Sequence, residues 1–174
     1  RVTQRMTYLK MGKKFEAGQV WDQLRRMGNP GLISSAVGLS HAGFYSEAAE
    51  FLTHFTSEIS DDHISLVDAY QKLSKLLMRL NRLDENVEAL KNLVDLDPAR
   101  QEAWQLLADV YQKYGQLQQA ISAIDKALQL NPKNEIHRTT KMNIATKILY
   151  QGDPGKALNL YEEILRGGPA MLNL

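Results

Sequence analysis

Apolar residues recur along most of the chain at the spacing of an amphipathic helix. The clearest stripe falls at i, i+3, i+4 and i+7 and consists of Trp104, Leu107, Ala108 and Tyr111. A second stripe runs from Leu117 to Leu128, after Gly115, a residue that favours a helix end. No stretch alternates apolar and polar residues long enough to predict a strand. The pattern therefore predicts an all-α protein.

The two stripes form a helix–turn–helix unit of about 34 residues. It ends at Asn131-Pro132, because a residue before proline is disfavoured in helical geometry. One period earlier, Tyr70 stands in place of Trp104 and Asn81 in place of Gly115. The predicted organisation is a single domain over residues 1–174, with a partial repeat at 1–28 and full repeats at 29–62, 67–100, 101–134 and 138–171. A few extra residues precede the repeats that begin at 67 and 138.

The residues that define the third full repeat are Trp104, Leu107, Ala108, Tyr111, Gly115, Ala120, Ile124, Ala127 and Pro132. This pattern resembles the tetratricopeptide repeat, and the resemblance extends over essentially the whole chain. It implies a right-handed superhelical solenoid of antiparallel helix–turn–helix hairpins. It also implies that the first helix of each hairpin lines a concave groove, which binds a peptide or helix of another protein.

The predicted groove residues lie on the first helices, away from the packing stripe. They are Ile33, Val37, His41, Gln71, Lys72, Lys75, Arg79, Gln105, Asp109, Lys113, Met142, Asn143, Thr146 and Tyr150. Exposed apolar residues on a helix face indicate a contact surface, and we expect this of Ile33, Val37, Met142, Leu149 and Tyr150. The alternative is that these are scattered surface residues or that they pack on a flanking segment. Lys72, Lys75 and Arg79 could meet an acidic or phosphorylated segment, or could simply form a solvated face.

One subset of the tetratricopeptide family holds the carboxylate tail of chaperones with Lys, Asn and Arg at set positions. In this chain the equivalent positions are Ile33, Val37, Lys72, Glu102 and Leu106, or one repeat later Gln71, Lys75, Leu106, Thr139 and Asn143. Neither set matches, so this function is not carried over.

Composition mainly narrows the choice of partner. The formal net charge of +1 gives little support to a nucleic-acid partner. No apolar run approaches the roughly 18 residues that a membrane span needs. The absence of cysteine excludes disulfides and thiolate metal sites, but does not fix the compartment. The expected partner is therefore a protein or peptide.

Candidate chemistry is sparse. The sequence has no P-loop, dinucleotide-binding glycine motif or His-Glu-x-x-His zinc motif. Asp61, Asp62 and His63 could touch a metal, but we expect Asp61 or Asp62 to cap the next helix. The stretch Gly152-Asp153-Pro154-Gly155 is interpreted as a hairpin turn, with Pro154 starting a helix. We expect no enzyme activity, cofactor or metal.

Two tryptophans and an apolar stretch at residues 167–174 also stand out in the sequence. Trp21 and Trp104 are expected in packing, and Trp104→Ala should cost about 3–5 kcal/mol as a buried truncation. The apolar tail at 167–174 suggests that the chain continues, that the tail packs back, or that two copies self-associate through it. The favoured function is a scaffold or adaptor. The alternatives are a small secretion or assembly chaperone and a regulatory domain of a larger enzyme.

Overall fold

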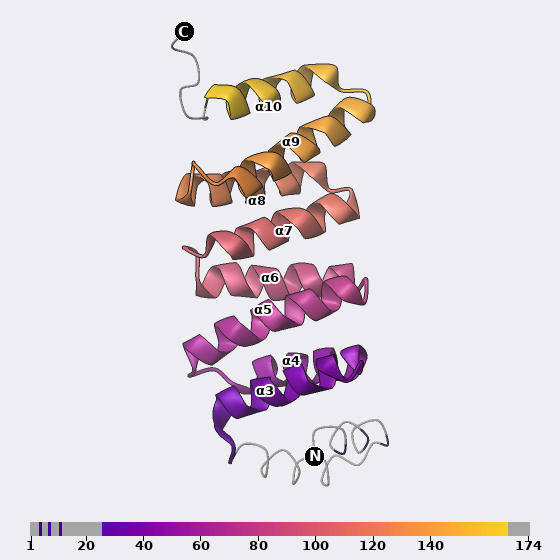
Figure 1. Cartoon of the computed structure of the whole chain (residues 1–174), viewed down its shortest axis with the longest axis vertical. Helices are drawn as coiled ribbons and strands as arrows, with labels where there is room; N and C mark the ends of the chain where they lie inside the picture. The colour runs from indigo at the N-terminus through magenta and orange to yellow at the C-terminus, as the bar shows by residue number, and fades with distance from the viewer. Residues whose placement is uncertain (1–3, 5–6, 8–10, 12–25, 167–174) are drawn as a thin grey trace. The chain divides into compact units, whose positions relative to one another are not determined.

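The computed structural model describes residues 4, 7, 11 and 26–166, and within 26–166 it contains eight α-helices and no strand (Figure 1). The predicted all-α repeat fold is confirmed. The chain divides into two compact units, Arg1–Leu96 and Asp97–Leu174. The prediction of one domain over 1–174 stays a prediction. The predicted partial repeat at 1–28, with Trp21, and the tail at 167–174 lie almost entirely outside the described residues.

The first unit contains two helical hairpins. They are built from α3 (Gly28–His41), α4 (Tyr45–Glu58), α5 (His63–Arg79) and α6 (Leu83–Leu96). Helix α5 packs against both helices of the preceding hairpin, as well as against α6. The largest fully buried side chains of this unit are Leu32, Phe51, Leu52, Phe55, Leu77, Leu90 and Leu93. These helices therefore share a continuous apolar core.

The second unit repeats this arrangement. Its helices are α7 (Gln101–Tyr114), α8 (Leu117–Leu130), α9 (Glu135–Tyr150) and α10 (Pro154–Arg166). Helix α9 contacts α7, α8 and α10. Ala108, Ala120 and Ala127 are fully buried, which permits the close approach of helix axes that their small size predicts.

Each hairpin turn contains one residue with a left-handed backbone. Gly43, Asn81, Gly115 and Gly152 have φ values of 87°, 58°, 79° and 92°. Glycine adopts this conformation without steric cost, and asparagine tolerates it better than most residues. Pro154 is the first residue of α10, as the turn interpretation of residues 152–155 predicts.

Two first helices begin earlier than the repeat pattern predicts. Helix α5 has 17 residues and α9 has 16, whereas α7 has 14. The extra residues are helical because a capping side chain precedes each helix. Asp62 Oδ1 accepts the Ser65 backbone N–H at 2.9 Å, and Asn134 Oδ1 accepts that of Ile136 at 2.9 Å. The expectation that Asp61 or Asp62 caps the next helix is thus confirmed for Asp62.

Two burial expectations are wrong. Ile33 was expected on the exposed face, but it is only 3% exposed, because α3 contacts both α4 and α5 and so buries a wider face. Trp104 was expected in the core, yet it is half-buried, and its indole Nε1 donates a hydrogen bond to the Pro98 carbonyl oxygen at 2.9 Å. The fully buried positions of α7 are instead Ala103, Ala108 and Val110.

No helix among the described residues combines the length and apolar character that a membrane crossing requires.

Candidate partner-binding face

The candidate face in the first unit is formed by α3 and α5. On α3, Val37 is half-buried and His41 is exposed, so of the predicted α3 residues only Ile33 is removed from the surface. On α5, Gln71 and Lys72 are half-buried, and Lys75 and Arg79 are exposed. All of the predicted residues other than Ile33 therefore retain some access to solvent.

The three basic side chains of α5 have different surroundings. Lys72 Nζ forms an ion pair with Asp68 Oδ1 one turn earlier on the same helix. The Arg79 guanidinium lies over the Tyr45 ring, 4.1 Å from its centroid. Lys75 has no ion pair among the described residues. The basic face thus contains one locally neutralised cation, one cation stacked on an aromatic ring and one free cation.

The candidate face in the second unit contains a hydrogen-bonded polar network between α7 and α9. Gln105 Nε2 donates to Asp109 Oδ1 at 3.1 Å and to Thr140 Oγ1 at 2.7 Å. These two bonds fix the orientation of the Gln105 amide, so its Oε1 faces His137 Nδ1 at 2.7 Å. His137 Nε2 lies 3.1 Å from Gln101 Oε1. The network connects one side of α9 to α7 through side-chain hydrogen bonds.

Burial shifts the pKa of both titratable groups in this network. Desolvation raises the pKa of Asp109, while the Gln105 hydrogen bond and the charge of Lys147 act in the opposite direction. Desolvation lowers the pKa of His137, opposed by the charge of Glu102. His137 is only 3% exposed, and this burial opposes a positive charge on its ring. Sequence reasoning placed Asp109 on the face but missed His137.

The outer face of α9 carries several exposed apolar side chains. Tyr150 is 84% exposed, Met142 46% and Leu149 42%. Thr146 lies between them along the helix, and its Oγ1 is 2.8 Å from the Tyr161 hydroxyl of α10. Asn143 is exposed as well, as is Lys113 on α7. The predicted exposure of this end of the face is confirmed at Met142 and Tyr150.

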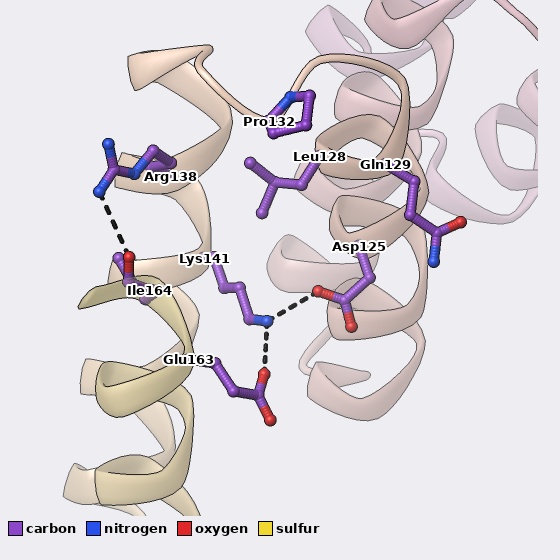
Figure 2. A pocket seen from close by; sticks show the side chains of 8 residues that line it. All are labelled: Asp125, Leu128, Gln129, Pro132, Arg138, Lys141, Glu163 and Ile164. Carbon is purple, nitrogen blue, oxygen red and sulfur yellow. Dashed lines mark hydrogen bonds and ion pairs between the residues drawn. The ribbon is translucent and has the colours of Figure 1, made fainter. Parts of the chain in front are cut away.

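Sequence reasoning missed a buried lysine at the junction of α8, α9 and α10. Lys141 Nζ lies 2.8 Å from Asp125 Oδ1 of α8 and 2.6 Å from Glu163 Oε2 of α10 (Figure 2). Burial lowers the pKa of Lys141, but the hydrogen bonds and charges of the two carboxylates outweigh it, so the pKa is raised. A cavity of about 430 Å³ adjoins this ion triad, lined also by Leu128, Pro132 and Ile164. The available signal was a lysine at the repeat position that holds Trp104 and Tyr70.

The acidic cluster at residues 61–63 can be compared with a metal site. Among the described residues, no group of three or more His, Cys, Asp or Glu side chains is placed to hold a metal ion. Asp62 of the Asp61-Asp62-His63 cluster is engaged as a helix cap, and its Oδ2 also accepts a 2.8 Å hydrogen bond from Asn29. The cluster therefore has a structural role in joining α3 to α5.

Models of the tetratricopeptide repeat match residues 67–100 and 102–134. The tetratricopeptide repeat domain-containing protein PYG7, chloroplastic, of Arabidopsis thaliana is 28% identical over 110 residues. That alignment covers 63% of this chain and 36% of the relative, so the chain spans about a third of that protein.

Two solved structures illustrate the similarity of fold. MamA 41-end from Desulfovibrio magneticus RS-1 has a TM-score of 0.62 and 18% identity, covering 94% of this chain and 90% of that one. The first TPR of Spaghetti (RPAP3), bound to the HSP90 peptide SRMEEVD, has a TM-score of 0.60 and 16% identity. It covers 70% of this chain and 93% of that one. Repeat period, turn chemistry and these matches agree, and residues 67–100 and 102–134 are tetratricopeptide repeats.

Proposed function

We propose that this chain is a protein-interaction scaffold that binds a peptide or helical segment of a partner on the faces presented by its first helices. The observation that carries the proposal is the outer face of α9. Met142, Leu149 and Tyr150 are exposed there, although the opposite face of the same helix supplies the buried Ile144, Ala145 and Ile148. Large apolar side chains that packing does not use are typical of contact surfaces.

The charge on α5 adds a second element to the proposal. Lys75 is exposed and unpaired among the described residues, and Arg79 is exposed over Tyr45. Such cations can form charge-assisted hydrogen bonds with carboxylate or phosphate groups. A partner segment with acidic residues therefore suits the α5 face, and a segment with apolar residues suits the α9 face. The bound HSP90 peptide of the RPAP3 structure is an example of a peptide held by the same fold.

The experiment is a quantitative capture of partners from a native lysate on the immobilised chain. Met142→Asp combined with Tyr150→Asp tests the α9 face, and Lys75→Glu tests the basic face. Matched controls are Leu130→Asp, an apolar position of α8 that is 44% exposed, and Lys126→Glu on the same helix. Thermal melting of every variant checks that it is folded.

The proposal predicts a protein that is retained by the wild type and both controls but lost from the α9 variant. Loss from Lys75→Glu as well would place acidic groups on that partner. If the α9 variant and Lys75→Glu retain the same proteins as the wild type, binding does not use these faces and the proposal is wrong. The chaperone and enzyme-domain alternatives stay hypotheses.

A further inference from the structure

Helices α8 and α10 are the second helices of successive hairpins. The apolar stripe of α8 is covered by the next helix, α9, whereas the corresponding stripe of α10 is exposed. Aligning their first residues, Leu117 and Pro154, pairs Ile121 with Leu158. Ile121 is 7% exposed, whereas Leu158 is 57% exposed. The same alignment pairs half-buried Leu128 with Leu165, which is 77% exposed.

The third pair on this stripe behaves in the same way. Ile124 is fully buried, and its counterpart on α10 is the half-buried Tyr161. The other side of α10 matches α8 in burial, since Ala157 and Ala120 are both at most 1% exposed. Both helices thus pack equally well on their own hairpin, and the difference is confined to one face. Helix α8 packs against α9, while the corresponding face of α10 meets no further helix in the described part of the chain.

The covered face of α8 shows what chemistry fits such a surface. Asp125, beside Ile124, receives Lys141 of α9 with a 2.8 Å contact from Nζ to Oδ1. The residue of α10 that corresponds to Asp125 is Glu162. Glu162 is 48% exposed, and among the described residues its ion pair is with Arg166, one turn later on its own helix. An acidic side chain therefore lies beside the open apolar stripe, as it does beside the covered one.

We infer that the face of α10 formed by Leu158, Tyr161, Glu162 and Leu165, here called the open face, binds an amphipathic helix that carries a lysine or arginine opposite Glu162. The binding helix places small or aliphatic residues on the stripe and its cation on Glu162, as α9 does on α8. This surface lies on a second helix, so it is separate from the proposed first-helix faces. With Leu158 and Leu165 exposed, the open face is more apolar than the polar outer face that is typical of a capping helix.

A second copy of this chain fits the open face less well. The simplest symmetric contact runs about a twofold axis and brings each residue at its centre against its own copy. Glu162 lies at the middle of the segment from Leu158 to Leu165, so such a contact would set two carboxylates against each other. Like charges in direct opposition are unfavourable, whereas a cationic helix is complementary.

The test uses a fluorescent peptide of residues 134–150, which form α9 and its cap, added to the full chain. An isolated helix of this length is marginal in water, so Thr139→Lys and Asn143→Asp are introduced in the peptide and joined as a lactam. Both positions are exposed in α9. Fluorescence anisotropy measures binding. The protein variants are Leu158→Asp, Glu162→Lys and the control Leu130→Asp, each verified by an unchanged melting curve.

We expect saturable binding that is weakened at least about tenfold by Leu158→Asp and not by Leu130→Asp. Changing Lys141 of the peptide to Glu should also weaken binding about tenfold, and Glu162→Lys in the protein should restore it. Equal binding by all protein variants, or no saturable binding, overturns the inference. Sedimentation velocity supplies the other decisive outcome. A wild-type dimer that Leu158→Asp dissociates would show that a second copy occupies the face instead.

Discussion

The hairpins α7–α8 and α9–α10 follow the same plan with different results. Each turn contains a left-handed glycine, and each second helix buries an alanine, Ala120 or Ala157, against its own first helix. Yet the stripe that is buried on α8 is open on α10. Local sequence therefore determines the hairpin, while the next element in the stack determines which of its apolar residues are buried.

A second difference lies at the signature aromatic position. The hairpin α7–α8 has Trp104, whose ring is half-buried and hydrogen-bonded to Pro98. The hairpin α9–α10 has Lys141, which is 6% exposed and held by two carboxylates next to a cavity of about 430 Å³. The same location is thus filled by an indole in one hairpin and by an ion triad in the other. Removing one member of a buried ion group destabilises a protein more than replacing all of its members with well-packed apolar residues.

The largest expected difference in stability is between variants with an aspartate at Ile121 of α8 and at the corresponding Leu158 of α10. Ile121→Asp should destabilise the second unit by at least about 3 kcal/mol, because it buries an unpaired carboxylate. Leu158→Asp should change the free energy of unfolding by less than about 0.5 kcal/mol, because the site is exposed. Urea denaturation followed by circular dichroism measures both. Similar losses for the two variants would mean that the open face is covered.

Removing the buried lysine should have the next largest effect. Lys141→Ala should cost about 2–4 kcal/mol, since it leaves Asp125 and Glu163 close together without their cation. Both carboxylates are partly exposed, so solvent reduces the penalty below that of a fully buried pair. Lys141→Trp, which introduces the residue of the preceding hairpin beside the cavity, should cost less than Lys141→Ala. Chemical denaturation gives the order, and the reverse order would contradict this view of the position.

Trp104→Ala is the change in the hairpin α7–α8 that corresponds to Lys141→Ala in α9–α10. The sequence alone suggests about 3–5 kcal/mol for a buried truncation, but the ring is half-buried, so we expect about 2 kcal/mol. Part of the loss comes from the hydrogen bond to the Pro98 carbonyl. Trp104→Phe, which keeps an aromatic ring without the donor, should recover most of the stability in the same denaturation experiment. A loss above about 4 kcal/mol would show that the indole is a core residue after all.

The alanine position of the second helices allows a stabilising test. Ala48, Ala120 and Ala157 are buried at this position, and in α6 it is occupied by Asn86. Neither Asn86 Nδ2 nor Oδ1 has a hydrogen-bond partner among the described residues. Asn86→Ala should stabilise the first unit by about 1–2 kcal/mol, since an unsatisfied buried amide is removed. A rise in melting temperature is the expected readout, and a fall would reveal that the amide has a role in the fold.

The smallest predicted effect is a pH dependence from His137. Its pKa is lowered by burial, so the unfolded chain binds more protons than the folded one around and below the ordinary histidine value of 6.5. The contribution of His137 to the free energy of unfolding is therefore fully present above that value and is lost as the pH falls below it. We expect the melting temperature to drop by roughly 2–4 °C between pH 7.5 and 5.5 through this group. His137→Gln should remove that part of the slope, and an unchanged slope would assign it to other groups.

Much of the fold could be predicted from the sequence because equivalent positions in several repeats have residues of the same type. The four left-handed turn residues and the helix ends before Pro98 and Pro132 follow from local backbone chemistry. The early starts of α5 and α9 could not be obtained from the period. They depend on the caps Asp62 and Asn134, which lie outside the repeated pattern.

The candidate face was harder to predict, because exposure depends on neighbours. Ile33 has the spacing of a surface residue but is covered by a second contact of α3. His137 precedes the repeat that begins at residue 138, so the repeat pattern gave no reason to consider it. Lys141 was marked only by being a lysine at the position of Trp104 and Tyr70. In contrast, the exposure of Met142 and Tyr150 on α9 followed directly from the register. Prediction therefore succeeded where one helix decides the outcome and failed where three helices meet.

The most direct test of the proposed scaffold function is site-specific photo-crosslinking in a native lysate. A photoreactive phenylalanine analogue is placed at Tyr150 on α9 or, as a control, at Leu130 on α8, both of which are solvent-exposed. Mass spectrometry identifies proteins joined to each position. We predict a specific partner crosslinked at Tyr150 and absent at Leu130, with the link lost when Met142→Asp is added. Crosslinks of equal yield at both positions, or at Leu130 alone, would contradict binding on the first-helix face.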